Sequence, residues 1–150
     1  MAKFTRDIEI RTGPEEVFEA LVSWSLLHEW STVTHSHTGA DRCGGVGDEF
    51  DQQLRVAGIP LQTHWRVVEF EPPESLAYDV TAMAGGRMAL RQQVVPTGEG
   101  SRVVFDVDYD LPGGFLGAAL DRAYVERRNE REVEHSLQNL KDLLEGRKPA

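Results

Sequence analysis

The spacing of glycine and proline constrains the fold of this chain more than any other feature of the sequence. Between residues 47 and 114, segments in which apolar and polar residues alternate are each followed by a turn rich in these two residues. Turns that recur every 10–15 residues are typical of an antiparallel meander. We therefore predict five consecutive strands, at residues 47–57, 61–71, 75–84, 87–96 and 101–111.

The segments on either side of the meander add helices and further strands. Residues 3–11 alternate as a half-buried strand does, and residues 32–37 are compatible with a short strand. Residues 12–24 predict a helix, because Thr12 and Glu15 have capping-box spacing and Pro14 suits a first turn. A short helix is expected at 25–30, and residues 115–145 predict one long helix with leucines 137, 140 and 144 in a stripe.

This order of elements predicts an α+β fold in a single domain, residues 1–146, followed by a frayed tail at 147–150. One antiparallel sheet, large enough to curl, has a single long C-terminal helix to cover its concave face. A curled sheet of this kind can enclose a cavity against the helix, although a solid core fits the same pattern.

Charge and cysteine content exclude several classes of partner. The chain has 150 residues and a formal charge of −9, which argues against nucleic acid, since that partner requires a basic surface. No segment approaches the ~20 apolar residues of a membrane span, and the first residues do not form a signal peptide. Cys43 is the only cysteine, so a reducing cytoplasm is the expected compartment.

The segment "THSHTGADRC" places His35, His37 and Cys43 close together in sequence. A metal site needs three or four ligands, so further ones would have to come from elsewhere, for instance His28 or His64. We expect instead no metal and no cofactor, with His35, His37 and Trp30 at the rim of a cavity. A catalytic role for Cys43 would need an adjacent base, and a passive thiol is the expectation.

Alternation within the strands predicts which side chains point inward. Phe50, Gln52 and Leu54 share one face of their segment, and Phe105 and Tyr109 share one face of theirs. A buried glutamine or tyrosine needs a hydrogen-bond partner, which can be backbone, water or a ligand. Both interpretations, structural and ligand-orienting, stay open for Gln52 and Tyr109.

Two further strands and the long helix are less clear from the pattern alone. In residues 61–71 we expect Trp65 to point inward, and in residues 87–96 we expect Leu90 inward and Arg91 outward. The middle of the long helix carries a charged turn that includes Glu130. That turn either lines the cavity or forms ion pairs on a solvated face.

Several segments, in this order and at this spacing, resemble one known superfamily. They are "IRTGPEEVFEAL", "HEWSTV", "GGVGDEF", "WRVVEFEPPESLAY", "GEGSRVVFDVDYDLPGG" and "NLKDLLE". The chain resembles the START-like (SRPBCC, birch-allergen-like) superfamily, in particular its polyketide cyclase/dehydratase branch. The resemblance implies a helix-grip fold: a curved seven-stranded antiparallel sheet around a long C-terminal helix, with two short helices after the first strand. It also implies an apolar small-molecule ligand.

The predicted function is therefore the binding of a lipid, polyketide or isoprenoid in an internal cavity. A cyclase or dehydratase-like enzyme without a bound metal is the alternative, with no catalytic residue assigned, and a helper that binds a protein partner is a third hypothesis. A homodimer stays open. The predicted ligand-binding residues are Phe50, Gln52, Leu54, Trp65, Tyr78, Leu90, Phe105, Tyr109, Leu120, Tyr124 and Arg127.

Overall fold

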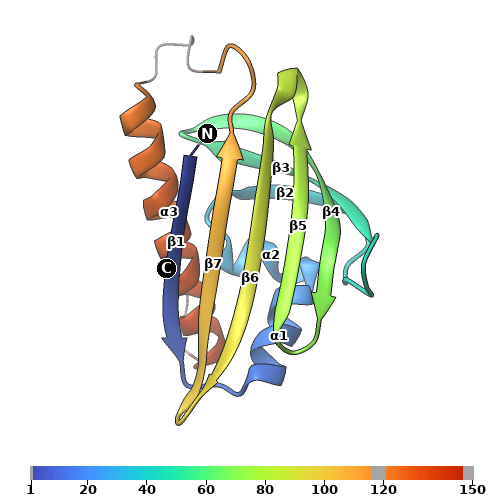
Figure 1. Ribbon diagram of the computed structural model, residues 1–150, viewed down its shortest axis with the longest axis vertical. Helices are drawn as coiled ribbons and strands as arrows, with labels where there is room; N and C mark the ends of the chain where they lie inside the picture. Colours follow the sequence, from blue (N-terminus) through green and yellow to red (C-terminus); the bar gives the residue numbers. More distant parts are fainter. Residues whose placement is uncertain (1, 116–120, 147–150) are drawn as a thin grey trace.

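A seven-stranded antiparallel sheet in the order β1-β7-β6-β5-β4-β3-β2 forms the body of the molecule (Figure 1). The computed structural model describes residues 2–115 and 121–146. The strands are β1 (Ala2–Ile10), β2 (Thr34–Gly39), β3 (Glu49–Val56), β4 (Ile59–Glu71), β5 (Ser75–Ala82), β6 (Arg87–Thr97) and β7 (Gly100–Asp110). Strands β2 to β7 pair in sequence order, and β1 pairs with β7.

Helices lie on one side of this sheet. Helix α1 (Pro14–Val22) follows β1 and leads through a 3-10 turn at Trp24–Leu26 into α2 (Leu27–Trp30). The long helix α3 (Arg122–Leu144) runs beside β1. This is the helix-grip fold that the resemblance implies. Among the described residues, no helix is both long and apolar enough to span a bilayer.

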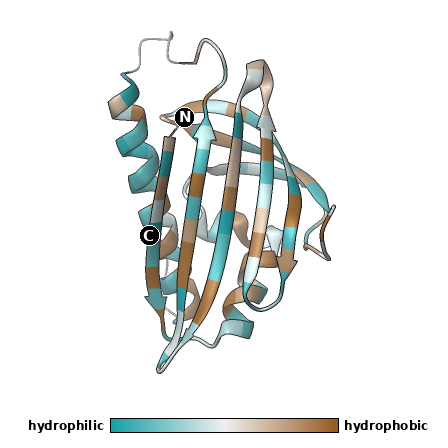
Figure 2. Ribbon diagram, in the orientation of Figure 1, coloured by the Kyte–Doolittle hydropathy of each residue, from teal (hydrophilic) through white to brown (hydrophobic). Residues whose placement is uncertain are grey.

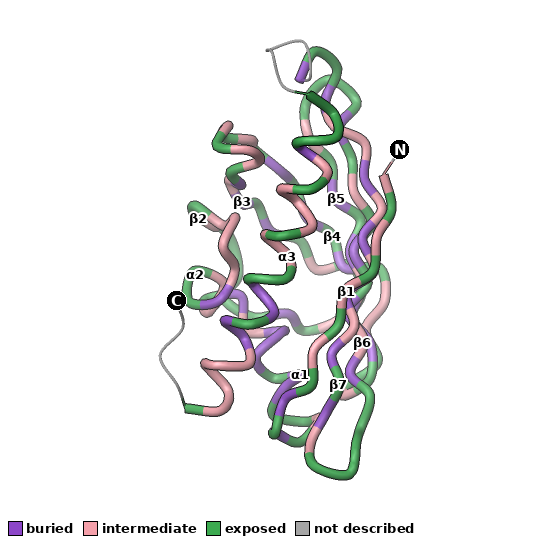
Figure 3. The backbone as a smooth tube through the Cα atoms, turned by 90° about the vertical axis from the view of Figure 1, so that its left-hand side faces the viewer, coloured by how far each residue is buried: buried purple, intermediate pink, exposed green. Residues whose placement is uncertain are grey.

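Strong curvature of the sheet creates an interior. Viewed edge-on, β2 and β3 stand across from β6 and β7, with α3 in front of the space between them (Figure 3). Two register shifts, between Thr34 and Ser36 in β2 and between Val67 and Glu69 in β4, accompany the bend. Extra residues at such bulges bend a strand and increase its twist, which helps the sheet to close on the helix.

The strand faces agree with the alternation of the sequence, which is visible as colour banding along the strands in Figure 2. In β7, Val103, Phe105, Val107 and Tyr109 are all buried, and their neighbours in sequence are more exposed. The inward facing of Trp65 and Leu90 and the outward facing of Arg91 are confirmed. The bulge in β4 leaves Val68 exposed at 41%.

Two predicted helix starts are corrected. Helix α1 is preceded by Gly13 with no side-chain cap, so Thr12 and Glu15 form no capping box. The Thr12 hydroxyl instead lies 3.4 Å from the carbonyl oxygen of Leu144 at the far end of the chain. Helix α3 begins at Arg122, capped by the carboxylate of Asp121, rather than at Phe115.

The charged turn of α3 forms ion pairs with the sheet. Arg6 of β1 pairs with Glu130, and its Nε donates to Glu134 Oε2 at 2.9 Å. The Arg6 guanidinium also lies 5.4 Å from the ring centre of Phe4. The charged turn therefore forms ion pairs with β1, the edge strand of the sheet.

Candidate ligand pocket

A pocket of about 180 Å³ lies between the inner face of the sheet and helix α3. Eight of the predicted ligand-binding residues line it: Phe50, Gln52, Leu54, Trp65, Tyr78, Leu90, Phe105 and Tyr109. Trp30 lines it from α2, and Asn129, Glu132, Val133 and Ser136 line it from α3. The alternating strands bring these side chains together because each contributes its inward row to the same concave face.

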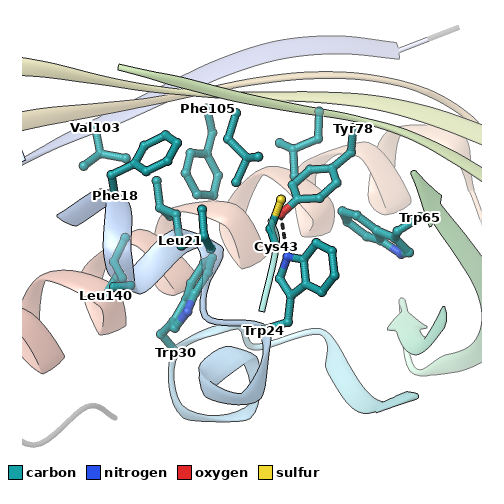
Figure 4. Close-up of a cluster of buried hydrophobic side chains, with 14 of the residues drawn as sticks. Phe18, Leu21, Trp24, Trp30, Cys43, Trp65, Tyr78, Val103, Phe105 and Leu140 are labelled. Carbon is teal, nitrogen blue, oxygen red and sulfur yellow. Dashed lines mark hydrogen bonds between the residues drawn. The ribbon is translucent and has the colours of Figure 1, made fainter. Parts of the chain in front are cut away.

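One wall of the pocket is a cluster of aromatic rings. Phe50, Trp65 and Tyr78 line the pocket, and Trp24 packs against Phe50 and Tyr78 without lining it; ring centres in the cluster are 4.3 to 6.5 Å apart. Figure 4 shows Trp24, Tyr78 and Trp65 side by side. The Trp24 indole N–H donates to the Tyr78 hydroxyl at 2.8 Å, and the Trp65 indole N–H donates to Thr63 Oγ1 at 2.8 Å. Burial raises the pKa of Tyr78 well above its usual range.

Gln52 is satisfied within the protein. Its Oε1 accepts a hydrogen bond from the hydroxyl of Thr34 at 2.8 Å, across the β2–β3 pair. This hydrogen bond supports the structural interpretation of Gln52.

Three other buried polar atoms of the pocket wall have no hydrogen-bond partner. They are Trp30 Nε1, Gln92 Oε1 and Tyr109 Oη, on side chains that are 4%, 3% and 8% exposed. Burial raises the pKa of the Tyr109 hydroxyl, which keeps it protonated near neutral pH, and the amide of Asn129 opposes this shift. Buried polar atoms are nearly always paired, so three atoms without a partner around one pocket are unusual.

The remaining predicted residues lie elsewhere. Tyr124 and Arg127 of α3 are exposed and do not line the pocket. The inward row of α3 runs through Val125, Asn129 and Val133, which are four residues apart, so Tyr124 and Arg127 occupy other faces of the helix. Leu120 lies outside the described residues.

The two histidines predicted for the rim also do not line the pocket. His35 is exposed, because it is the extra residue of the β2 bulge and does not share a face with His37. His37 is opposite Gln52 and its ring contacts the edge of the aromatic cluster, 6.3 Å from the ring centre of Phe50, without lining the pocket.

Cys43 is part of the core and not of a site. It is 1% exposed, burial raises the pKa of its thiol, and it lies with Trp24 and Tyr78 in Figure 4. His64 lies on the outer face of the sheet, where Asp51 and Glu49 raise its pKa through hydrogen bonds. Within residues 2–115 and 121–146, no group of three His, Cys, Asp or Glu side chains is arranged to hold a metal ion.

Sequence reasoning left the facing of Gln92 open and missed the indole N–H of Trp30 as a pocket group. Gln92 follows Leu90 by two positions, so the same alternation that places Leu90 inward also places Gln92 inward. Nothing in the sequence indicated that their polar atoms would be left without partners.

Comparison with known proteins gives consistent results. Residues 1–145 match the family described as polyketide cyclase / dehydrase and lipid transport. A curated relative named Toxin Rv0910, from Mycobacterium tuberculosis, is 26% identical over 97% of this chain and 100% of its own length. The crystal structure of TTHA0849 from Thermus thermophilus superposes with a TM-score of 0.81 at 19% identity, covering 97% of this chain and 98% of that one. The crystal structure of Ara h 8.0201 superposes with a TM-score of 0.71 at 12% identity, with the same coverage of both chains.

Proposed function

Because the chain belongs to the polyketide cyclase / dehydrase and lipid transport family, we propose that it binds a small, mostly apolar molecule in the pocket between sheet and helix α3. The observation that carries the proposal is the pocket wall itself. Its strand residues are mainly aromatic and aliphatic, as in most small-molecule sites, and a few polar groups are set among them.

The volume of the pocket limits the size of the ligand. An apolar cavity of about 150 Å³ suffices to bind benzene, whereas sites for drug-sized molecules usually span about 300–1,000 Å³. A pocket of about 180 Å³ therefore suits a molecule of one or two rings or a short chain. A larger lipid or polyketide would require side chains or α3 to move.

The energetics also favour occupancy. An empty cavity costs about 24 cal/mol per Å³ in lost contacts, so a ligand that fills it recovers part of this free energy. Such a ligand stabilises the folded state by RT ln(1 + L/Kd), where L is the free ligand concentration, so the stabilisation grows with the logarithm of that concentration once it exceeds the dissociation constant.

A dye-binding experiment tests the proposal. The fluorescence of the two-ring dye 6-propionyl-2-(dimethylamino)naphthalene, which fits the size limit of the pocket, is expected to rise on addition of the protein. Phe105→Trp and Met88→Trp add bulk to pocket-lining residues and should each weaken dye binding about tenfold or more, because overpacking excludes the ligand.

The matched control is Phe70→Trp, since Phe70 packs on Phe18 outside the pocket and this variant should bind the dye as the parent protein does. Thermal unfolding of each variant verifies that it is folded. If the parent protein leaves the dye dark, or if both pocket variants bind it unchanged, the proposal is wrong and a protein-partner role becomes the hypothesis to test.

A cyclase or dehydratase-like activity is the second candidate, favoured by the family description. Tyr109 is the group that we would expect to act, because its protonated hydroxyl could donate to a carbonyl oxygen of a bound substrate. Native mass spectrometry of the freshly purified protein separates the two candidates, since a carrier retains an unchanged ligand and an enzyme releases a dehydrated or cyclised one.

The name of the mycobacterial relative supports one further possibility for the biological outcome. That relative is called a toxin, and a pocket that sequesters or converts a small metabolite could inhibit growth. Growth arrest on induced expression that is lost in Phe105→Trp would connect the pocket to such a role.

A further inference from the structure

We propose that the ligand carries a hydrogen-bonding group at each of two ends, one held by Gln92 and Trp30 and the other by Tyr109. This inference rests on the proposed ligand-binding function and specifies the chemistry of the ligand. The expected class is a small apolar ring system with hydroxyl or keto groups on opposite sides, in contrast to a plain hydrocarbon.

The first anchor lies around Phe105. Gln92 of β6 stands directly opposite Phe105 of β7 in the strand register, and the Trp30 ring packs edge-on against the Phe105 ring with centres 6.1 Å apart. Trp30 Nε1 can only donate and Gln92 Oε1 only accepts. A hydroxyl group suits either atom, because it can accept from the indole N–H or donate to the amide oxygen.

The second anchor lies farther along the same strands. Tyr109 stands opposite Met88 and contacts the Phe4 ring, two residues before Leu111, which also lines the pocket. Its hydroxyl can donate or accept and makes no hydrogen bond of good geometry in the protein, although the Asn129 side chain of α3 lies close enough to lower its pKa against the raising effect of burial. A keto or hydroxyl oxygen of a ligand would complete this end.

These three residues contrast with the other polar side chains of the same wall. Gln52, Trp65 and Tyr78 are equally buried and each has a partner in the protein, which for Tyr78 is the indole N–H of Trp24. Three polar atoms of the pocket lining, Trp30 Nε1, Gln92 Oε1 and Tyr109 Oη, have no such partner. An unpaired buried polar group costs about 1–3 kcal/mol, so a ligand that pairs with it gains affinity.

The spacing of the anchors sets the span of the ligand. Four residues of strand separate Phe105 from Tyr109, or about 13 Å at about 3.3 Å per residue. Hydrogen bonds of about 2.8 Å at each end shorten the span that the ligand itself must cover. Two fused rings with substituents at opposite ends are shorter than this strand distance and agree with the pocket volume of about 180 Å³.

Isothermal titration calorimetry with naphthalene, 2-naphthol and 2,6-dihydroxynaphthalene tests the proposal. Gln92→Leu and Tyr109→Phe should each weaken binding of the diol by roughly three- to tenfold and leave the affinity for naphthalene unchanged. Because Gln92 Oε1 has no partner to lose, Gln92→Leu should fold at least as stably as the parent protein.

Two matched controls make the same chemical changes outside the pocket. Gln93→Leu alters the next residue of β6, and Tyr124→Phe alters an exposed tyrosine of α3. Both should bind all three compounds as the parent protein does. If the parent and the two pocket variants bind the diol equally well, the anchors are refuted while the apolar pocket stands; if the parent binds none of the three compounds, the proposed function fails with them.

Discussion

The hydrogen bond between Trp24 and Tyr78 shows how polar groups of aromatic side chains can be buried together. Both side chains are at most 4% exposed, and the indole N–H has the Tyr78 hydroxyl as its acceptor. The aromatic rings exclude water, so neither group has an alternative partner nearby. The contribution of such a residue to the free energy of unfolding therefore depends on whether its buried polar atom is paired.

We predict that Tyr78→Phe lowers the free energy of unfolding by about 1–3 kcal/mol, because it leaves the Trp24 N–H buried without an acceptor. Urea denaturation followed by far-UV circular dichroism measures the change. Tyr109→Phe is the matched control, because its hydroxyl makes no hydrogen bond of good geometry in the protein, so its removal should not lower the free energy of unfolding. Equal losses in the two variants would contradict this account.

At the scale of elements, the first half of α3 has fewer buried apolar residues than the second half, and ion pairs connect the helix to β1. In the second half of the helix, Leu137 and Leu140 are buried apolar residues. In the first half, Val125 is buried. The ion pairs from Arg6 to Glu130 and Glu134 lie between these regions. This half of α3 also supplies Asn129 to the pocket wall, so its attachment influences the pocket.

We predict that Arg6→Gln increases amide hydrogen exchange in the first half of α3 while β6 and β7 stay protected. The Arg6 side chain is 31% exposed, so solvent screening limits the contribution of the pairs to about 1 kcal/mol or less, and added salt should reduce it further. Arg102→Gln is the control, because Arg102 pairs with Asp7 on the neighbouring strand and does not touch α3. Unchanged exchange in Arg6→Gln would show that apolar packing alone holds the helix.

At the scale of the whole molecule, sheet and helices share one core. Ile10 of β1, Phe18 of α1, Trp65 of β4 and Leu140 of α3 belong to a single cluster of buried side chains, visible in part in Figure 4 and as the buried inner side of the tube in Figure 3. The sheet cannot open on the helix without exposing this cluster.

We therefore predict cooperative two-state unfolding of one domain. Tryptophan fluorescence, which reports on Trp24, Trp30 and Trp65, and far-UV circular dichroism should give the same midpoint in guanidinium chloride. Two separate transitions would instead indicate that α3 or the β2–β3 edge unfolds as an independent unit.

The sequence by itself determined the order of strands and helices and the inward faces of the long strands, because both follow from local rules. Glycine and proline mark the turns, and a period of two assigns Phe105, Tyr109 and Leu90 to one face. The face of α3 and the place of His35 depended on where a helix begins and on a bulge between strands, which local patterns do not specify. Only the tertiary structure decided that Gln52 is paired while Gln92 is not, although both are inward glutamines. The reason is physical: a hydrogen-bond partner comes from another strand, and Thr34 happens to reach Gln52 whereas no side chain reaches Gln92 Oε1.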